Sequence, residues 1–242
     1  MKKENAPRIQ IKAFRDIMRA GGDKERAAFE KTYLKCTDKF FGTSVPFADR
    51  MAKDFRKRNE KSDREYIIAL AKELFTSEYH DEKRLGLRIL QYYPDYLDLS
   101  LMPLLEDMLM HSSTWDLIDD ISIHLVSIVL EKDRKAYRYL KKWSRSESFW
   151  MRRASLISQI LLFRKNRGDN KLFYSFAERM INEKEFFIRK AIGWSIREMA
   201  KGNADEAFRF LMKIRDRASG LTLREGAKRL PENMKAQVLG KE

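Results

Sequence analysis

The sequence predicts an all-α protein, an α-solenoid of HEAT-like helix-pair repeats of about 35 residues each, curved around a basic groove. Three observations support this fold class. The 242 residues include only 10 glycines and 5 prolines, which is few for a chain rich in turns and strands. Apolar residues recur with a helical period of about 3.6 in almost every segment, and the alternation typical of strands is nearly absent. The helical segments also follow one another in pairs.

The first 60 residues predict two or three helices that do not follow the paired pattern. These helices cover Gln10–Ala20, Lys24–Lys35 and Phe47–Arg58, and the last one follows the turn FFGTSVPF. Residues 50–58, RMAKDFRKR, are strongly basic. Such a run is either a solvated helix face or a helix that contacts phosphates, and the sequence leaves both interpretations open.

Residues 66–230 predict five helix pairs. Each pair is too small to bury its apolar face alone, so neighbouring pairs are expected to stack and share a continuous core. The pairs are Tyr66–Phe75 with Lys83–Tyr93, Leu101–Met110 with Trp115–Leu130, Ala136–Trp143 with Trp150–Phe163, Lys171–Ile181 with Phe187–Lys201, and Asp205–Ile214 with Leu223–Leu230.

The second helices of the five pairs align with one another at steps of 35, 34, 37 and 35 residues. A HEAT-like array is favoured over a tetratricopeptide array, because the Trp/Gly/Tyr/Pro signature of the latter is missing. We expect one domain over residues 1–242, with equivalent positions of the second helices on one side of the groove. These positions are Arg84, Asp119, Arg153, Lys190 and Glu225.

The composition points to a polyanionic partner. Lys and Arg total 50 against 36 Asp and Glu, a net charge of +14. Such a surplus suits DNA, RNA or an acidic membrane surface, although it also suits a merely soluble surface. Cys36 is the only cysteine, so an internal disulfide is excluded, and no Cys/His cluster has zinc spacing. His80, His111 and His124 are each expected at the surface or in the core, and we expect no metal or other cofactor.

Two further expectations concern location. The N-terminal stretch MKKENAPRIQIKAF lacks the apolar core of a signal peptide. No apolar run approaches the roughly 18 residues that span a membrane. We therefore expect an intracellular, cytoplasmic protein without a membrane partner.

Standard enzyme motifs are missing, and the candidate chemistry lies on the aligned second helices. There is no phosphate-binding Gly loop, HExxH, GxSxG or Cys/His dyad. Polar and aromatic side chains accumulate instead at equivalent places on successive second helices. They are Trp115 with Asp119, Arg152 with Arg153, and Trp194 with Arg197.

These three residue types suit hydrolysis of the glycosidic bond of a cationic nucleobase. A carboxylate stabilises a developing cation and orients or deprotonates water. An indole holds a flat cation by cation–π attraction, about 0.5–2 kcal/mol each. An arginine binds phosphate through its planar fork. An alkylated purine is a flat cation, and the sugar passes through an oxocarbenium-like state as the bond breaks.

Structural roles for the same residues stay open at this point. A helical tryptophan usually packs in a core. An aspartate in a first turn often complements the helix dipole, a role that suits Asp116 better than Asp119. An arginine pair in a groove is often only solvated.

Five stretches of the sequence resemble the AlkD-like family of bacterial alkylpurine DNA glycosylases, which are HEAT-like repeat proteins. They cover the chain from about residue 40 to 230, and the WxxxD pair and the KAIGWxxRE segment are specific in combination. The stretches are FFGTSVPFADRMAK at 40–53, TWDLID at 114–119, FWMRRA at 149–154, FFIRKAIGWSIREMAK at 186–201 and LTLREGAKRL at 221–230.

The resemblance implies a monofunctional, metal-independent enzyme that removes 3-methylated and 7-methylated purines from duplex DNA in base excision repair. Asp119 matches the family's catalytic aspartate, and Trp115 and Trp194 match the two tryptophans that cradle the deoxyribose of the lesion. Arg153 matches the arginine beside the aspartate. We expect a nucleoid-associated monomer whose DNA-binding residues are Arg152, Arg197, Ser44, Val45, Pro46 and Lys190.

The sequence departs from the family at two places. The turn at 42–46 reads GTSVP, where the family has a polar residue and Thr before the proline. Since that turn is expected to approach the DNA, the departure bears on how DNA is engaged. The segment around Asn166–Asn170 is also slightly longer than in the family.

Two other classes of function compete with the enzyme. A non-catalytic helical array that recognises DNA or RNA by shape explains the charge, but it does not explain Trp115, Asp119 and Trp194 at matched positions. A protein-interaction scaffold is the commonest use of such arrays, and the basic balance argues against it.

Overall fold

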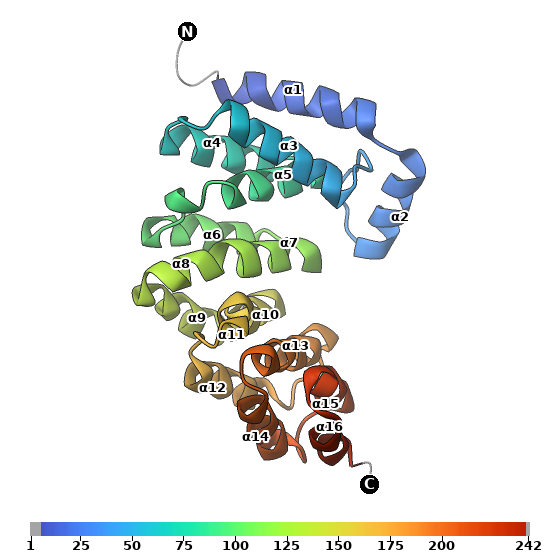
Figure 1. The fold of residues 1–242 in the computed structure, drawn as a ribbon. Coiled ribbons are helices and arrows are strands. Elements are labelled where there is room, and N and C mark those ends of the chain that lie inside the picture. Colours follow the sequence, from blue (N-terminus) through green and yellow to red (C-terminus); the bar gives the residue numbers. More distant parts are fainter. Residues whose placement is uncertain (1–5, 241–242) are drawn as a thin grey trace. The chain divides into compact units, whose positions relative to one another are not determined.

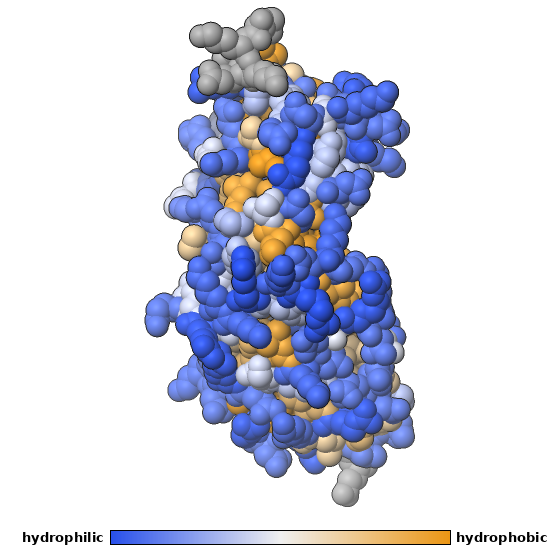
Figure 2. Space-filling view, turned by 90° about the vertical axis from the view of Figure 1, so that its left-hand side faces the viewer, coloured by the Kyte–Doolittle hydropathy of each residue, from blue (hydrophilic) through white to orange (hydrophobic). Residues whose placement is uncertain are grey.

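The computed structural model describes residues 6–240. Within this range the chain is helical, and its one β feature is an isolated parallel bridge between Lys39 and Tyr79. Residues 1–5 of the stretch assessed for a signal peptide lie outside the described residues. None of the helices between residues 6 and 240 is long and apolar enough to cross a membrane. The face shown in Figure 2 is mostly hydrophilic, with small hydrophobic areas between the polar side chains.

The contacts between residues divide the chain into two compact units. The first unit holds the residues up to Asp98 together with His111–Ile121, and the second holds Leu99–Met110 and the residues from Ser122 onward. The helices of the first unit are α1 (Ala6–Gly21), α2 (Lys24–Leu34), α3 (Val45–Arg58), α4 (Arg64–Phe75), α5 (His80–Gln91), the 3-10 helix η2 (Pro94–Tyr96) and α7 (Trp115–Asp119).

The second unit contains the longest helix, α13 (Phe186–Gly202). Its other α-helices are α6 (Met102–Met110), α8 (Ser127–Lys132), α9 (Tyr137–Trp143), α10 (Phe149–Ile157), α11 (Ile160–Arg164), α12 (Asn170–Met180), α14 (Ala204–Ile214), α15 (Gly220–Gly226) and α16 (Glu232–Leu239). Short 3-10 helices cover Leu99–Leu101, Arg134–Ala136 and Ala227–Arg229, and the π-helix η4 (Asp120–Val126) joins α7 to α8.

In the first unit, α5 packs against both α3 and α4, and α1 covers α4 (Figure 1). Side-chain caps start the helices: Asp23, Ser44 and Asp63 each accept a hydrogen bond from a backbone N–H in the first turn of α2, α3 and α4. Between α2 and α3, Gly42 has φ +81°, and a Cβ there would lie 2.0 Å from the carbonyl oxygen of Asp23. Only glycine fits this turn.

In the second unit, α13 packs against α10, α11, α14 and α15 (Figure 1). Ile188, Ile192 and Ile196 place one side of α13 in the core, where each is at most 1 % exposed. Gly193 allows α15 to approach closely, because a Cβ at this position would lie 2.7 Å from the Cβ of Glu225. Apolar packing along a helix of 17 residues therefore fixes α13 in its unit.

Side-chain hydrogen bonds recur between residues about one predicted repeat apart. Tyr96 donates to the carbonyl of Ser62, 34 residues away, and Arg164 donates to Glu198 at the same separation. Lys213 bonds Glu178, 35 residues away. Trp143 donates its indole N–H to Glu106 across 37 residues. The separation of 34–37 residues seen in the sequence pattern is thus also a separation at which side chains meet within each unit.

The prediction of an all-helical chain is confirmed, and most predicted helices match observed ones within a few residues. Three details differ. The predicted helix Trp115–Leu130 contains the π-helix η4, and the predicted helix Trp150–Phe163 is divided into α10 and α11 by Ser158 and Gln159. Helix α16 was not predicted from the sequence.

Candidate active site

Trp115 and Asp119 lie one turn apart on α7. Leu117 and Ile118 hold the opposite side of this short helix in the core, where they are 2 % and 0 % exposed. Trp115 is half-buried, and Asp119 is buried, with 9 % of its surface exposed. Thr114 precedes the helix but makes no side-chain capping bond. The sequence spacing therefore predicted the local relation of the indole and the carboxylate correctly.

Two aromatic residues that were not predicted from the sequence extend from Trp115. The ring of Tyr33 meets the ring of Trp115 edge-on, with centroids 6.0 Å apart, and Phe29 stacks on Tyr33 at 5.6 Å. Phe29 and Tyr33 are 66 % and 58 % exposed. They lie four residues apart on α2, a helix with no clear apolar face, and exposed aromatics at that spacing were the available signal.

Asp119 ends α7, and the next residue begins the π-helix η4. π-Helices are rare and occur frequently at functional sites. Asp120 forms an ion pair with Arg88, whose Nη2 lies 3.0 and 3.2 Å from the two carboxylate oxygens. Burial nevertheless raises the pKa of Asp120 to about 6, and the neighbouring charge of Asp116 contributes to the increase. Two adjacent carboxylates thus occupy the buried end of α7.

The GTSVP turn places its three candidate DNA-binding residues at the start of α3. The Ser44 hydroxyl accepts a hydrogen bond from the Phe47 amide at 3.2 Å, so it serves as the cap of the helix. Val45 and Pro46 are exposed. Thr43, just before them, is bound through its amide and hydroxyl to Asp81. The bonds between Thr43 and Asp81 therefore hold the turn in place, while Val45 and Pro46 remain exposed.

In the second unit, Arg153 lies among aromatic side chains. It is 2 % exposed and donates a hydrogen bond to the carbonyl oxygen of Phe187 at 2.8 Å. Its guanidinium carbon is 5.6 Å from the ring centroid of Phe187 and 5.9 Å from that of Trp194. Trp194 is half-buried and donates its indole N–H to Glu198 at 3.3 Å. Arg153 and Trp194, predicted from separate helices, thus meet within this unit.

The other predicted residues of this unit differ in how they are engaged. Arg152 makes a bidentate ion pair with Glu183 at 2.9 and 2.8 Å and also binds the carbonyls of Ser146 and Glu147. Arg197 pairs with Glu225 and stands 6.0 Å from the Trp194 ring centroid. A phosphate would have to compete with these carboxylates.

Lys190 differs from the residues at the other aligned positions, because it is exposed. Arg84, Asp119, Arg153 and Glu225 are buried. The Nζ of Lys190 lies 5.6 Å from the ring of Phe186, which is 50 % exposed. Lys190 and Phe186 together present a cation and an aromatic ring at the start of α13.

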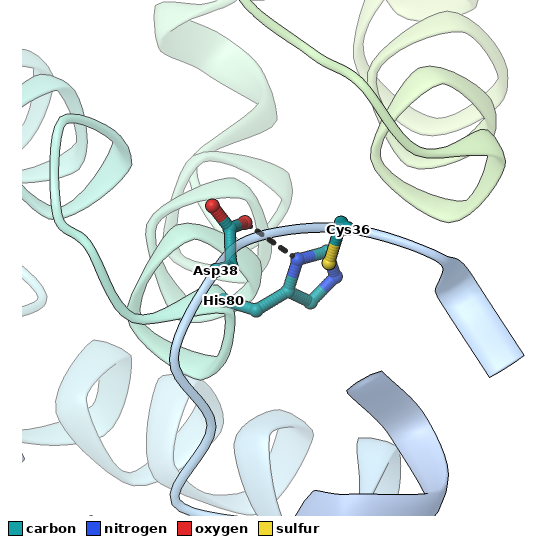
Figure 3. A group of neighbouring side chains, drawn as sticks. All are labelled: Cys36, Asp38 and His80. Carbon is teal, nitrogen blue, oxygen red and sulfur yellow. Dashed lines mark hydrogen bonds and ion pairs between the residues drawn. The ribbon is translucent and has the colours of Figure 1, made fainter. Parts of the chain in front are cut away.

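Cys36, Asp38 and His80 form a group whose potential ligand atoms lie within 4.8 Å of one another (Figure 3). The donor set does not fit a metal ion. His80 Nδ1 lies 3.1 Å from Asp38 Oδ2, and Lys83 Nζ lies 2.8 Å from Asp38 Oδ1. Burial raises the pKa of the Cys36 thiol, which disfavours the thiolate that binds metal. Protons and the Lys83 ammonium already occupy the places where a cation would bind.

The chain was also compared with known proteins. A family model described as DNA alkylation repair enzyme matches residues 14–230 of the 242. No curated protein matches the sequence significantly.

Three solved structures share the fold at low sequence identity. A structure described as a predicted DNA alkylation repair enzyme from Enterococcus faecalis has a TM-score of 0.78 and 21 % identity, over 87 % of this chain and 97 % of that one. AlkD2 from Streptococcus mutans has a TM-score of 0.59 and 15 % identity, over 86 % and 98 %. The protein smu.31 from Streptococcus mutans UA159 has a TM-score of 0.55 and 16 % identity, over 77 % and 99 %.

Proposed function

Because the chain belongs to the DNA alkylation repair enzyme family, we propose that it is a DNA glycosylase for cationic alkylated purines. The reaction is hydrolysis of the bond between a 3-methylated or 7-methylated purine and its deoxyribose in duplex DNA. Breaking this bond sends its electron pair to the base, which leaves as a neutral purine. The oxygen of water then bonds the sugar carbon and gives up a proton. The reaction requires no metal.

The observation that carries the proposal is the pairing of Trp115 with Asp119 on α7. The carboxylate of Asp119 stabilises the oxocarbenium-like sugar and orients the attacking water. The indole of Trp115 offers its π-face to the same cationic sugar. Partial burial of the pair lowers the local dielectric and strengthens both interactions.

The second unit supplies DNA-binding groups in this proposal. Trp194 contacts the sugar and backbone around the lesion, and the buried Arg153 holds a positive charge beside the Trp194 ring. Lys190 contributes a phosphate contact. Val45 and Pro46 approach the DNA from the turn before α3. Arg152 and Arg197 are weaker candidates, because Glu183 and Glu225 already pair with them.

We propose the same architecture that the sequence pattern indicates. The helices form one HEAT-like repeat domain with a basic groove for duplex DNA, and the protein acts as a cytoplasmic, nucleoid-associated monomer in base excision repair. The side-chain bonds at separations of 34–37 residues support the repeat. The net charge of +14 supports the polyanionic partner.

The second candidate is a non-catalytic protein of this fold that recognises DNA or RNA by shape. Such a protein needs the same basic groups at the phosphates as the glycosylase, but it gives Trp115 and Asp119 no role.

The test is release of free base from a duplex that carries one 7-methylguanine, assayed in the presence of a chelator. We expect release of 7-methylguanine with excess protein over DNA, and no release of guanine from the matched undamaged duplex. Tight, salt-sensitive binding of the methylated duplex without any release would contradict the glycosylase and favour the binding protein.

A further inference from the structure

Five successive ionisable residues open α5, and together they bind α1, α2, α7 and the segment between α2 and α3. They are His80, Asp81, Glu82, Lys83 and Arg84, of which all but the half-buried Lys83 are buried. Glu82 pairs with Arg15 of α1, and Asp81 binds the amides of Phe41 and Thr43. Charged side chains at five successive positions of a buried helix start are costly unless each has a partner.

His80 lies between two carboxylates from different segments. Its Nδ1 is 3.1 Å from Asp38 in the segment after α2, and its Nε2 is 2.7 Å from Asp116 in α7. An ionised carboxylate only accepts hydrogen bonds, so both ring nitrogens must donate. The His80 side chain is fully buried. The pKa values of Asp38 and Asp116 both lie below the ordinary value, so both carboxylates are ionised and favour a buried imidazolium between them.

Charged groups from several segments surround His80. Asp38 from the segment after α2 and Asp116 from α7 contact its ring, and Lys83 and Arg84 of α5 pair with these two carboxylates. Arg84 also faces Glu30 of α2, which pairs with Arg26 of the same helix. Loss of the proton on His80 would remove a positive charge between two carboxylates and turn a ring nitrogen lone pair toward one of them.

Asp116 connects this cluster to the proposed catalytic residues. It follows Trp115 directly and precedes Asp119 by three positions. Helix α7 starts without a side-chain cap and runs directly into η4, so Asp116 lies in an uncapped first turn. Leu117 and Ile118 hold it against the core, but the charged contacts of Asp116 with His80 and Arg84, 2.7 and 3.5 Å long, restrain its rotation and position along the axis.

We propose that the His80 imidazolium is a positioning residue for the Trp115–Asp119 face of α7. This inference rests on the proposed function, since it assigns His80 a role in base release without contact with the substrate. The imidazolium donates hydrogen bonds to Asp116 and to Asp38. It therefore links α7 to the start of α5 and to the segment after α2. Figure 3 shows one of these two contacts, the one between His80 and Asp38.

The protonation of His80 makes the role measurable. Burial lowers the pKa of His80, but the hydrogen bonds with Asp116 and Asp38 outweigh it and raise the pKa above its ordinary value. Loss of the proton at higher pH is expected to release Asp116, and the indole of Trp115 is expected to report the release.

The first experiment uses NMR of the full-length protein labelled with ¹⁵N in histidine and tryptophan. His80→Gln assigns the imidazole and Trp115→Phe assigns the indole. We expect two protonated ring nitrogens in His80 at neutral pH, and a shift of the Trp115 indole signal with the same midpoint as the His80 titration. The inference would be overturned by an indole signal that does not change with this titration, or by a His80 side chain that is neutral at pH 6.

The second experiment measures single-turnover base release and DNA affinity. We expect His80→Gln to slow release by ~10²-fold, the effect of a misplacement of about 1 Å, with affinity changed by less than about 2-fold. Asp116→Asn keeps the size of the side chain and tests the same bond if His80→Gln folds poorly. Arg15→Gln is the matched control, because it removes a bond to the same start of α5 without touching His80 or α7.

The outcomes separate this inference from the proposed function. Equal slowing by His80→Gln and Arg15→Gln would show only a loss of stability and would overturn the positioning role. A wild-type protein that releases no methylpurine would overturn the glycosylase, and the NMR titration of Trp115 would then decide alone whether His80 positions α7.

Discussion

Helices α7 and α13 carry the same residue types but are fixed in their units by different forces. In α7, Trp115 is followed by Asp119, and in α13, Trp194 is followed by Arg197 and Glu198. Helix α13 has a row of buried isoleucines, whereas α7 starts without a side-chain cap and binds His80 and Arg84 through Asp116. The position of α13 follows from apolar packing, and that of α7 also requires a charged network.

The two tryptophans differ in the same way. The indole N–H of Trp194 donates to Glu198, whose carboxylate also binds Arg164 and Lys201. Burial raises the pKa of Glu198, but the bonds with Lys201 and Arg164 outweigh it and hold the pKa below its ordinary value. Trp115, in contrast, meets the edge of the Tyr33 ring within the first unit. Substitutions in α13 should thus affect stability and DNA affinity, and substitutions around α7 should affect the reaction.

The largest effect is expected from loss of apolar packing in α13. Ile196→Ala removes a fully buried side chain and should lower the free energy of unfolding by about 2–5 kcal/mol, because a cavity remains. Denaturant unfolding followed by circular dichroism measures it. Ile9→Ala, at a position 57 % exposed, is the control and should change stability by less than about 0.5 kcal/mol. Equal effects would contradict the assignment of α13 to the core.

A smaller effect is expected from loss of the indole on α7. Trp115→Ala should slow base release by about 2- to 30-fold, which corresponds to the loss of a cation–π attraction of about 0.5–2 kcal/mol with the cationic sugar. Trp115→Phe retains an aromatic face and should recover part of the rate. Single-turnover release at saturating protein measures both. Two variants with the same low rate would show that the indole acts only through packing.

The charged network should make stability depend on pH. Burial raises the pKa of Asp116, but its bond and charge interaction with His80 lower it to about 2, so its contribution is lost only as the pH falls through that value. The contribution of His80 is complete below its unfolded pKa of about 6.5 and is lost as the pH rises through its raised pKa. The network is therefore most stabilising between about pH 4 and 6.5.

Wild type and His80→Gln should differ most in unfolding free energy near pH 5.5 and least near pH 9. The loss amounts to about 1.4 kcal/mol for each unit by which folding raises the pKa. The raised pKa of Asp120 also makes the free energy of unfolding fall as the pH rises from about 4 to 6. This fall cancels in the difference between wild type and His80→Gln, because both proteins contain Asp120. A constant difference from pH 5 to 9 would contradict the buried imidazolium.

The smallest effect is expected from a single exposed cation on α13. Lys190→Gln should weaken DNA binding by a few fold and reduce the slope of log affinity against log salt by about 1. Fluorescence anisotropy over a range of salt concentrations measures both quantities. Lys213→Gln removes an exposed lysine of α14 that is paired with Glu178, and it should leave the slope unchanged. Equal slopes for the two variants would contradict the proposal that Lys190 contacts DNA.

The sequence predicted the helices well, because helix periodicity is a local property. It predicted Trp115 and Asp119 on one face for the same reason, as their spacing is one helical turn. It did not predict the π-helix after Asp119, since nothing in the residues 120–126 departs from an ordinary helical pattern. Helix α16 was missed because its eight residues have only a weak amphipathic pattern.

Long-range partners were the main feature that the sequence could not provide. His80 was expected as a surface or core residue, and it is in the core. Its bonds with Asp38 and Asp116 join residues 42 and 36 positions apart, which no local pattern reveals. Arg152 was expected at the DNA, but its bidentate pairing with Glu183 depends on a contact 31 residues away. The HDEKR run at 80–84 was the visible signal, since five charged or polar residues begin an otherwise buried helix.

The most direct test compares wild type and Asp119→Asn on one duplex with a single 7-methylguanine, with release and affinity measured on the same samples. Asp95→Asn, at an exposed position of the first unit, is the control. We predict that Asp119→Asn slows release by roughly 10³-fold while affinity is unchanged or tighter, because a carboxylate near phosphates weakens binding. Release by Asp119→Asn at the wild-type rate would contradict the assignment of Asp119 as the catalytic carboxylate.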